Sequence, residues 1–195
     1  MKEVLLIGDS IRMYSQNRIC ELIGEEYHVS APEENCKFST YTLNTLRVWL
    51  EQFPKPDIIH WNNGLWDTAI LYQEDGCFTP LELYLENLKK ILRELRKTGA
   101  EIIFASITPV DPKKANPPEG FSVHHNEDIQ RYNRAALALM EQEKVIINDL
   151  YPLMIPHLDS YIRQDDLIHP TEEGIEVIAR EIVNKIHLAN QKRMI

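Results

Sequence analysis

An apolar run, Val4-Leu5-Leu6-Ile7, is followed at once by Gly8-Asp9-Ser10. Consecutive apolar residues that end in glycine and aspartate fit a strand buried on both faces, as in a parallel sheet covered by helices. A helix-like stretch follows from residue 11. The pattern therefore predicts that Ser10 lies at the carboxyl end of the first strand, the edge at which open α/β sheets bind their ligands.

Short apolar runs continue to alternate with amphipathic stretches along the rest of the chain. Five alternations of an expected strand with an expected helix predict a parallel sheet covered on both faces. No repeat or change of composition indicates a second domain, so residues 1–195 are expected to form a single domain. The expected strands are 4–7, 27–30, 57–61, 101–106 and 144–148, and the expected helices are 11–24, 40–53, 79–97, 126–143 and 171–189.

Ser10 has two interpretations in this setting. At a helix N-terminus, unpaired N–H groups and the positive end of the helix dipole favour an anion. The oxyanion that forms when a serine attacks a carbonyl group is one such anion. In the alternative interpretation, Ser10 only caps its helix. A catalytic role requires a base elsewhere in the chain.

Residues 165–171 read Asp-Asp-Leu-Ile-His-Pro-Thr and place Asp166 three residues before His169. Pro170 disfavours a helical conformation at His169, which predicts a loop. A nucleophilic serine needs an adjacent base, and the base needs a group that holds its tautomer. His169 and Asp166 would supply both, although a capping aspartate beside a surface histidine is the alternative.

The longest irregular stretch of the sequence runs from residue 108 to residue 125. A loop of this length in a compact domain is typical of a lid or a specificity loop, or of a partly disordered segment. It contains His124 and His125, which are rival candidates for the base, but no motif of the Asp166–His169 kind precedes them, so they rank below His169.

Taken together, Gly8-Asp9-Ser10 and Asp166-Leu167-Ile168-His169-Pro170 resemble the first and last sequence blocks of the SGNH (GDSL-type) hydrolase family. The blocks stand at opposite ends, so the resemblance covers essentially the whole chain. It implies a flavodoxin-like three-layer α/β/α sandwich with strand order 2-1-3-4-5. It also implies a triad of Ser10, His169 and Asp166, ester hydrolysis that is often deacetylation, and no cofactor or metal.

The resemblance is looser in the two middle blocks, which supply oxyanion donors in the family. The second block usually offers a glycine N–H, but no glycine lies between Gly24 and Gly64 here. The N–H of Ser39 is the expected replacement, beside the N–H of Ser10. In the third block, Asn-Asn-Gly-Leu-Trp-Asp resembles a branch in which Asn62 or Asn63 would donate its amide. An Asn-Gly turn is the alternative interpretation.

Two further side chains are candidates for substrate binding. Arg12 follows Ser10 closely and would meet a substrate anion, or else pair with an acidic neighbour. Trp66 would form an apolar or sugar-stacking wall, or else cover the core. The implied substrates are short acyl esters, particularly acetyl groups on small molecules or carbohydrates.

Charge and cysteine content exclude several classes of protein. A net charge of −9 argues against nucleic acid or an anionic membrane surface as the main partner, because both require basic patches. The three cysteines give neither a disulfide framework nor a metal-binding spacing. The apolar run at the start is too short for a signal peptide and no stretch would span a membrane, so a cytoplasmic location is expected.

A catalytically silent, flavodoxin-like ligand-binding domain is the alternative to a serine esterase. A nucleotide or flavin site would require a phosphate-binding loop after the first strand. Asp9 would repel phosphate at that position, whereas the altered middle blocks are compatible with loss of catalysis. The sequence carries no signal for an oligomeric state.

Overall fold

The computed structural model describes residues 1–71, 76–113 and 123–193. Within these residues, a five-stranded parallel sheet has the order β2-β1-β3-β4-β5, which confirms the expected fold class and strand order. The strands are β1 (Lys2–Ile7), β2 (Tyr27–Ser30), β3 (Ile58–Asn62), β4 (Glu101–Ala105) and β5 (Ile146–Asn148). The helices are α1 (Ser10–Leu22), α2 (Ser39–Gln52), α3 (Leu81–Arg96), α4 (Asn126–Gln142), α5 (Leu150–Met154), the 3₁₀ helix η1 (Ile155–His157), α6 (Leu158–Tyr161) and α7 (Glu172–Arg193).

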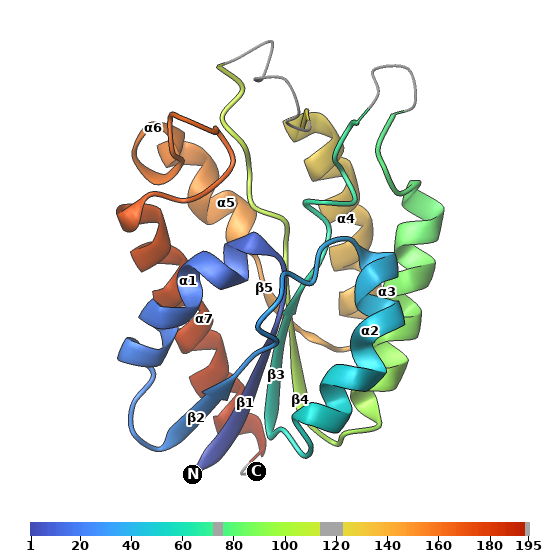
Figure 1. The fold of residues 1–195 in the computed structure, drawn as a ribbon, viewed down its shortest axis with the longest axis vertical. Coiled ribbons are helices and arrows are strands. Elements are labelled where there is room, and N and C mark those ends of the chain that lie inside the picture. The colour runs from blue at the N-terminus through green and yellow to red at the C-terminus, as the bar shows by residue number, and fades with distance from the viewer. Residues whose placement is uncertain (72–75, 114–122, 194–195) are drawn as a thin grey trace.

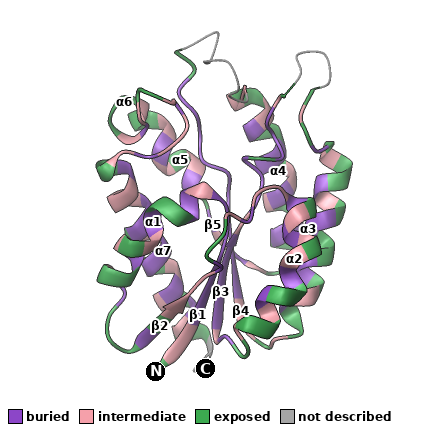
Figure 2. Ribbon diagram, viewed as in Figure 1, coloured by how far each residue is buried: buried purple, intermediate pink, exposed green. Residues whose placement is uncertain are grey.

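Helices cover both faces of the sheet. Helices α1 and α7 pack together on one face, and α2, α3 and α4 cover the other (Figure 1). This arrangement explains the uninterrupted apolar run in β1, where Val4, Leu5, Leu6 and Ile7 are each no more than 1% exposed. Burial follows the strands and the inward sides of the helices (Figure 2).

The connections that follow β1, β2 and β3 all leave the sheet at its carboxyl edge, where the strands are parallel and in register. The candidate residues after these strands therefore meet at one edge, together with the loop that precedes α7 (Figure 1). Of the expected lid at 108–125, residues 114–122 lie outside the described residues. At its described end, Val123 forms an antiparallel backbone bridge with Ile70.

A search of the described helices for long apolar stretches found none able to cross a bilayer.

Candidate active site

Ser10 is the first residue of α1, but it does not cap that helix. The N-cap is Asp9, whose side chain accepts the backbone N–H of Ile11 at 3.0 Å. The Ser10 hydroxyl is thereby left for another contact. Its backbone N–H lies in the first turn of α1, where helical N–H groups have no partner within the helix.

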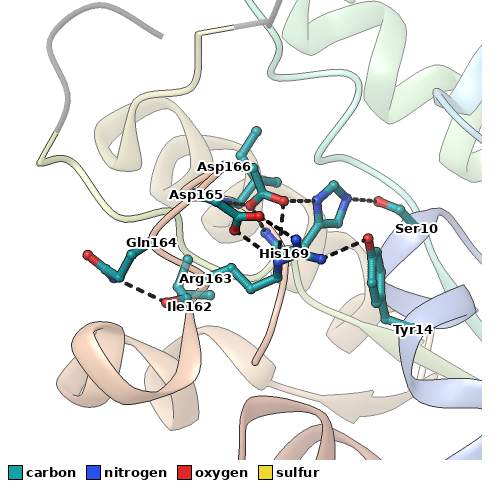
Figure 3. Close-up of polar contacts among 9 residues, drawn as sticks. Ser10, Tyr14, Ile162, Arg163, Gln164, Asp165, Asp166 and His169 are labelled. Carbon is teal, nitrogen blue, oxygen red and sulfur yellow. Dashed lines mark hydrogen bonds and ion pairs between the residues drawn. The ribbon is translucent and has the colours of Figure 1, made fainter. Parts of the chain in front are cut away.

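The Ser10 hydroxyl and the loop before α7 form a continuous hydrogen-bonded chain (Figure 3). Ser10 Oγ lies 2.9 Å from His169 Nε2, and His169 Nδ1 lies 2.9 Å from Asp166 Oδ2. When the Nδ1 proton is donated to Asp166, Nε2 is the acceptor for the Ser10 hydroxyl proton. The arrangement can deprotonate a serine as it attacks an electrophile.

Asp166 is fixed by its own loop. Its Oδ1 accepts the backbone N–H groups of Ile168 and His169, both at 2.9 Å, while Oδ2 receives the imidazole. Burial opposes ionisation, but these N–H groups and the imidazole outweigh it and hold the pKa of Asp166 below its usual range. The carboxylate is therefore ionised when the histidine works as a base.

Arg163 stabilises the same loop through its backbone and its side chain. Sequence reasoning did not single it out. Its backbone N–H donates to the carbonyl of His169 at 2.8 Å, and its carbonyl accepts the N–H of Leu167 at 2.9 Å. The guanidinium pairs with Asp165, and its Nη1 donates to the hydroxyl of Tyr14 at 3.3 Å (Figure 3). The Tyr14 ring lies 4.8 Å from the imidazole, centroid to centroid, and so covers His169.

A pocket of about 480 Å³ opens in front of Ser10 and His169. Its size is that of a small-molecule site. Most of the described side chains around it are apolar or aromatic, which suits the carbon skeleton of an ester. The described lining is Ser10, Tyr14, Asn35, Phe38, Leu65, Trp66, Ala69, Leu71, Phe78, His124, Ile168 and His169.

Tyr14, which sequence reasoning also missed, carries a signal that could have found it. It stands four residues after Ser10 on α1, a spacing that places both side chains on one face of a helix. Trp66 lines the pocket and is 39% exposed. His124 lines it as well, but burial lowers the pKa of His124 to about 4, and the Ser10 hydroxyl has His169 as its hydrogen-bond partner.

The structure does not bring Arg12 to this pocket. The side chain is 3% exposed, and its guanidinium donates to the carbonyl of Glu34 at 2.6 Å and to Gln16 at 2.7 Å. A further contact reaches the carbonyl of Gly8 at 3.4 Å. Arg12 therefore ties the connection after β2 to the start of α1, and it is not positioned to meet a substrate anion.

Asn62, the last residue of β3, is not among the residues that line the pocket. Its amide donates to Asp9 Oδ1 at 3.0 Å, so it supports the N-cap of α1. A Cβ at Gly8 would lie 2.0 Å from Asn62 Oδ1 and 2.8 Å from Arg12 Cβ. The close approach of these two side chains explains why glycine stands before Asp9-Ser10.

The amides of Asn63 and Ser39 are also held away from the pocket. The Asn63 amide donates to the carbonyl of Lys37 at 3.1 Å and to the Thr42 hydroxyl at 2.9 Å. Both the backbone N–H and the hydroxyl of Ser39 donate to Asp67. Neither Asn63 nor Ser39 is among the lining residues, so the expected donors brace the connections around the site instead.

Asp67 predicts a specific pH dependence of stability. It is fully buried, and burial raises its pKa to about 6, against the hydrogen bonds from Ser39 and Thr79. Because the folded pKa lies above the unfolded value, the stabilisation from the bound proton is complete below about pH 4 and is lost as pH rises through 6. A two-unit shift corresponds to about 3 kcal/mol.

We expect the free energy of unfolding of wild type, minus that of Asp67→Asn, to fall between pH 4 and pH 7. Urea unfolding of both proteins across this range measures the difference. The contributions of other titrating groups to the free energy of unfolding are the same in both proteins and cancel in the subtraction. A difference that stays constant would show that Asp67 does not titrate in this window.

Among the described residues, no group of three or more His, Cys, Asp or Glu side chains is arranged to hold a metal ion. The site as described consists of the hydrogen-bonded chain and the pocket before it.

A sequence model of the GDSL-like lipase/acylhydrolase family matches residues 6–177, which include Ser10, Asp166 and His169. The chain belongs to this family. Members hydrolyse esters, and the protein is accordingly a hydrolase that acts on ester bonds. The family match confirms the resemblance read from the two terminal blocks. A search of curated proteins found no match.

Solved structures of two acetylesterases and a GDSL-like lipase share this fold at low sequence identity. An acetyl xylan esterase is 14% identical with a TM-score of 0.72, over 94% of this chain and 99% of that one. A carbohydrate acetylesterase from Sinorhizobium meliloti is 16% identical with a TM-score of 0.75, over 96% and 99%. A GDSL-like lipase from Bacteroides thetaiotaomicron is 16% identical with a TM-score of 0.69, over 96% and 89%.

Proposed function

We propose that this GDSL-type hydrolase is a serine esterase in which Ser10 is the nucleophile, His169 the general base and Asp166 the residue that orients it. The observation that carries the proposal is the hydrogen-bonded chain from Ser10 Oγ through the imidazole to Asp166, with both links at 2.9 Å. Two members of this hydrogen-bonded chain, Ser10 and His169, line a pocket large enough for an ester.

In the first half of the reaction, Ser10 Oγ bonds to the ester carbonyl carbon and its proton passes to His169 Nε2. The carbonyl oxygen becomes an oxyanion, which the Ser10 N–H in the first turn of α1 would stabilise. Collapse of this intermediate breaks the bond to the alcohol, which takes the proton from Nε2. Asp166 stabilises the imidazolium in between.

In the second half, water attacks the acyl group on Ser10 and gives its proton to Nε2. The carbon–oxygen bond to the serine then breaks, the proton returns to Oγ, and the carboxylic acid leaves. The reaction needs water as its only co-reactant.

The proposed substrates are short-chain acyl esters, particularly acetyl esters of small molecules or carbohydrates. The similarity to an acetyl xylan esterase and a carbohydrate acetylesterase supports this class. Trp66 supports it as well, because an exposed aromatic face on a pocket wall can pack against an acyl methyl group or the apolar face of a sugar ring.

The test joins turnover with covalent labelling. Wild type is assayed with p-nitrophenyl acetate, and a fluorophosphonate probe is located on the chain by peptide mass spectrometry. We expect hydrolysis above a no-enzyme blank and a label on Ser10. A protein that neither hydrolyses the ester nor takes the label would contradict the proposal and favour a catalytically silent ligand-binding domain.

A further inference from the structure

Asn35 is a pocket-lining amide that the sequence motifs do not single out. It lies in the connection between β2 and α2, is half-buried, and lines the pocket together with Ser10 and His169. In the resemblance to the GDSL-type family, this is the connection in which a glycine N–H is expected to donate to the oxyanion. A polar side chain at that place matters because Ser39, Asn62 and Asn63 are engaged in other contacts.

The segment around Asn35 is tied to the corner that carries the nucleophile. The N–H of Cys36, the next residue, donates to the carbonyl of Gly8 at 3.1 Å. The carbonyl of Glu34, the preceding residue, accepts the guanidinium of Arg12 at 2.6 Å. Hydrogen bonds on both sides therefore hold Asn35 against the β1–α1 corner, which leaves its position little freedom relative to Ser10.

The orientation of the amide follows from a third contact. Asn35 Oδ1 accepts the backbone N–H of Lys37 at 2.8 Å in an Asx turn. A backbone N–H requires an acceptor, so this bond identifies the oxygen end of the planar amide. The opposite end, Nδ2, has no hydrogen-bond partner among the described residues, and it is the end that remains for a ligand in the pocket.

We propose that Asn35 Nδ2 donates a hydrogen bond to the substrate oxyanion, beside the backbone N–H of Ser10. The inference rests on the proposed function, since it assigns a catalytic residue to the same reaction. A donor that is held in place before the reaction stabilises charge that develops in the transition state more than it stabilises the substrate. Loss of Asn35 should therefore lower kcat much more than it raises KM.

Two substitutions separate donation from turn formation. Asn35→Asp keeps the size of the side chain and the acceptor for the Lys37 N–H, but it removes the donor. Asn35→Ala removes both. We expect each to lower kcat by on the order of 10²- to 10³-fold, the typical effect of removing one oxyanion donor. Asn17→Asp, at an exposed position farther along α1, adds the same charge and should retain wild-type kcat.

The rate of fluorophosphonate labelling is a second readout, because phosphonylation of Ser10 also passes through an anionic intermediate. We expect both Asn35 variants to label slowly while their thermal unfolding midpoints stay close to that of wild type. An Asn35→Asp variant that keeps wild-type kcat while Asn35→Ala loses it would overturn the inference in favour of a role in the turn alone. Wild-type kcat in folded Asn35→Ala would overturn it outright.

The two proposals fail in different ways. If wild type is labelled at Ser10 and both Asn35 variants label at the same rate, only the assignment of Asn35 is wrong. If wild type itself is neither active nor labelled, the serine esterase proposal and this inference both fail.

Discussion

Ser10→Ala is expected to abolish ester hydrolysis, with kcat reduced on the order of 10⁴-fold or more. The substitution removes the atom that forms the acyl intermediate in the proposed mechanism, and it leaves His169 without the hydroxyl 2.9 Å from its Nε2. The side chain is small and does not cap α1, since Asp9 does. Steady-state hydrolysis of p-nitrophenyl acetate measures the loss.

His169→Ala is the companion to this experiment and should show a loss of similar size, because nucleophile and base act as a unit. Circular dichroism and thermal unfolding establish that both variants fold. The variant that carries both Ser10→Ala and His169→Ala should have a kcat no lower than that of either single variant. Folded Ser10→Ala protein that retains appreciable turnover would place the nucleophile elsewhere in the chain.

Asp166→Asn is expected to lower kcat on the order of 10⁴-fold with little change in fold. The reason lies in the two backbone N–H groups, from Ile168 and His169, that point at Oδ1. An asparagine must place its oxygen there to accept them, which turns its NH₂ group toward the imidazole. Nδ1 would then have to accept, so Nε2 would carry the proton and could not take one from Ser10.

Asp165→Asn is the matched control for this prediction. Asp165 is the adjacent residue and pairs with Arg163 at the surface, but it does not contact the imidazole. Its loss should change kcat/KM by less than about fivefold, as expected for an exposed ion pair. Equal losses in the two variants would mean that charge near the loop matters and that the tautomer of His169 does not.

The α/β fold class and the pairing of Asp166 with His169 could be predicted from the sequence because both depend on local patterns. Apolar runs of strand length and amphipathic helical stretches predict the alternation of strands and helices and most boundaries within a few residues, whereas the strand order comes from the resemblance to the GDSL-type family. The pair Asp166 and His169 lies in one short loop, so its internal geometry is set by residues that are neighbours in sequence. Only the approach of this loop to Ser10 is long-range, and the order of the strands and helices dictates it.

The side chains around the triad were harder to assign, because their roles depend on contacts between separate connections. Asn62 and Asn63 are adjacent in sequence and point to opposite sides of a strand end, so one supports Asp9 and the other reaches Lys37 and Thr42. Nothing in the spacing indicates that Ser39 meets Asp67, or that Arg12 is buried against Glu34. Such partners become apparent only once β1, β2 and β3 stand side by side.

The contact between α1 and α7 has a consequence for how the enzyme is made. Ser10, the proposed nucleophile, lies at the start of α1, while His169, its proposed base, lies 159 residues later in the loop before α7, and these two helices pack together on one face of the sheet. A chain emerging from the ribosome therefore displays Ser10 long before it has any means of activating that serine. We expect esterase activity to appear only after the loop before α7 has reached α1, so the onset of turnover would report the docking of these two segments.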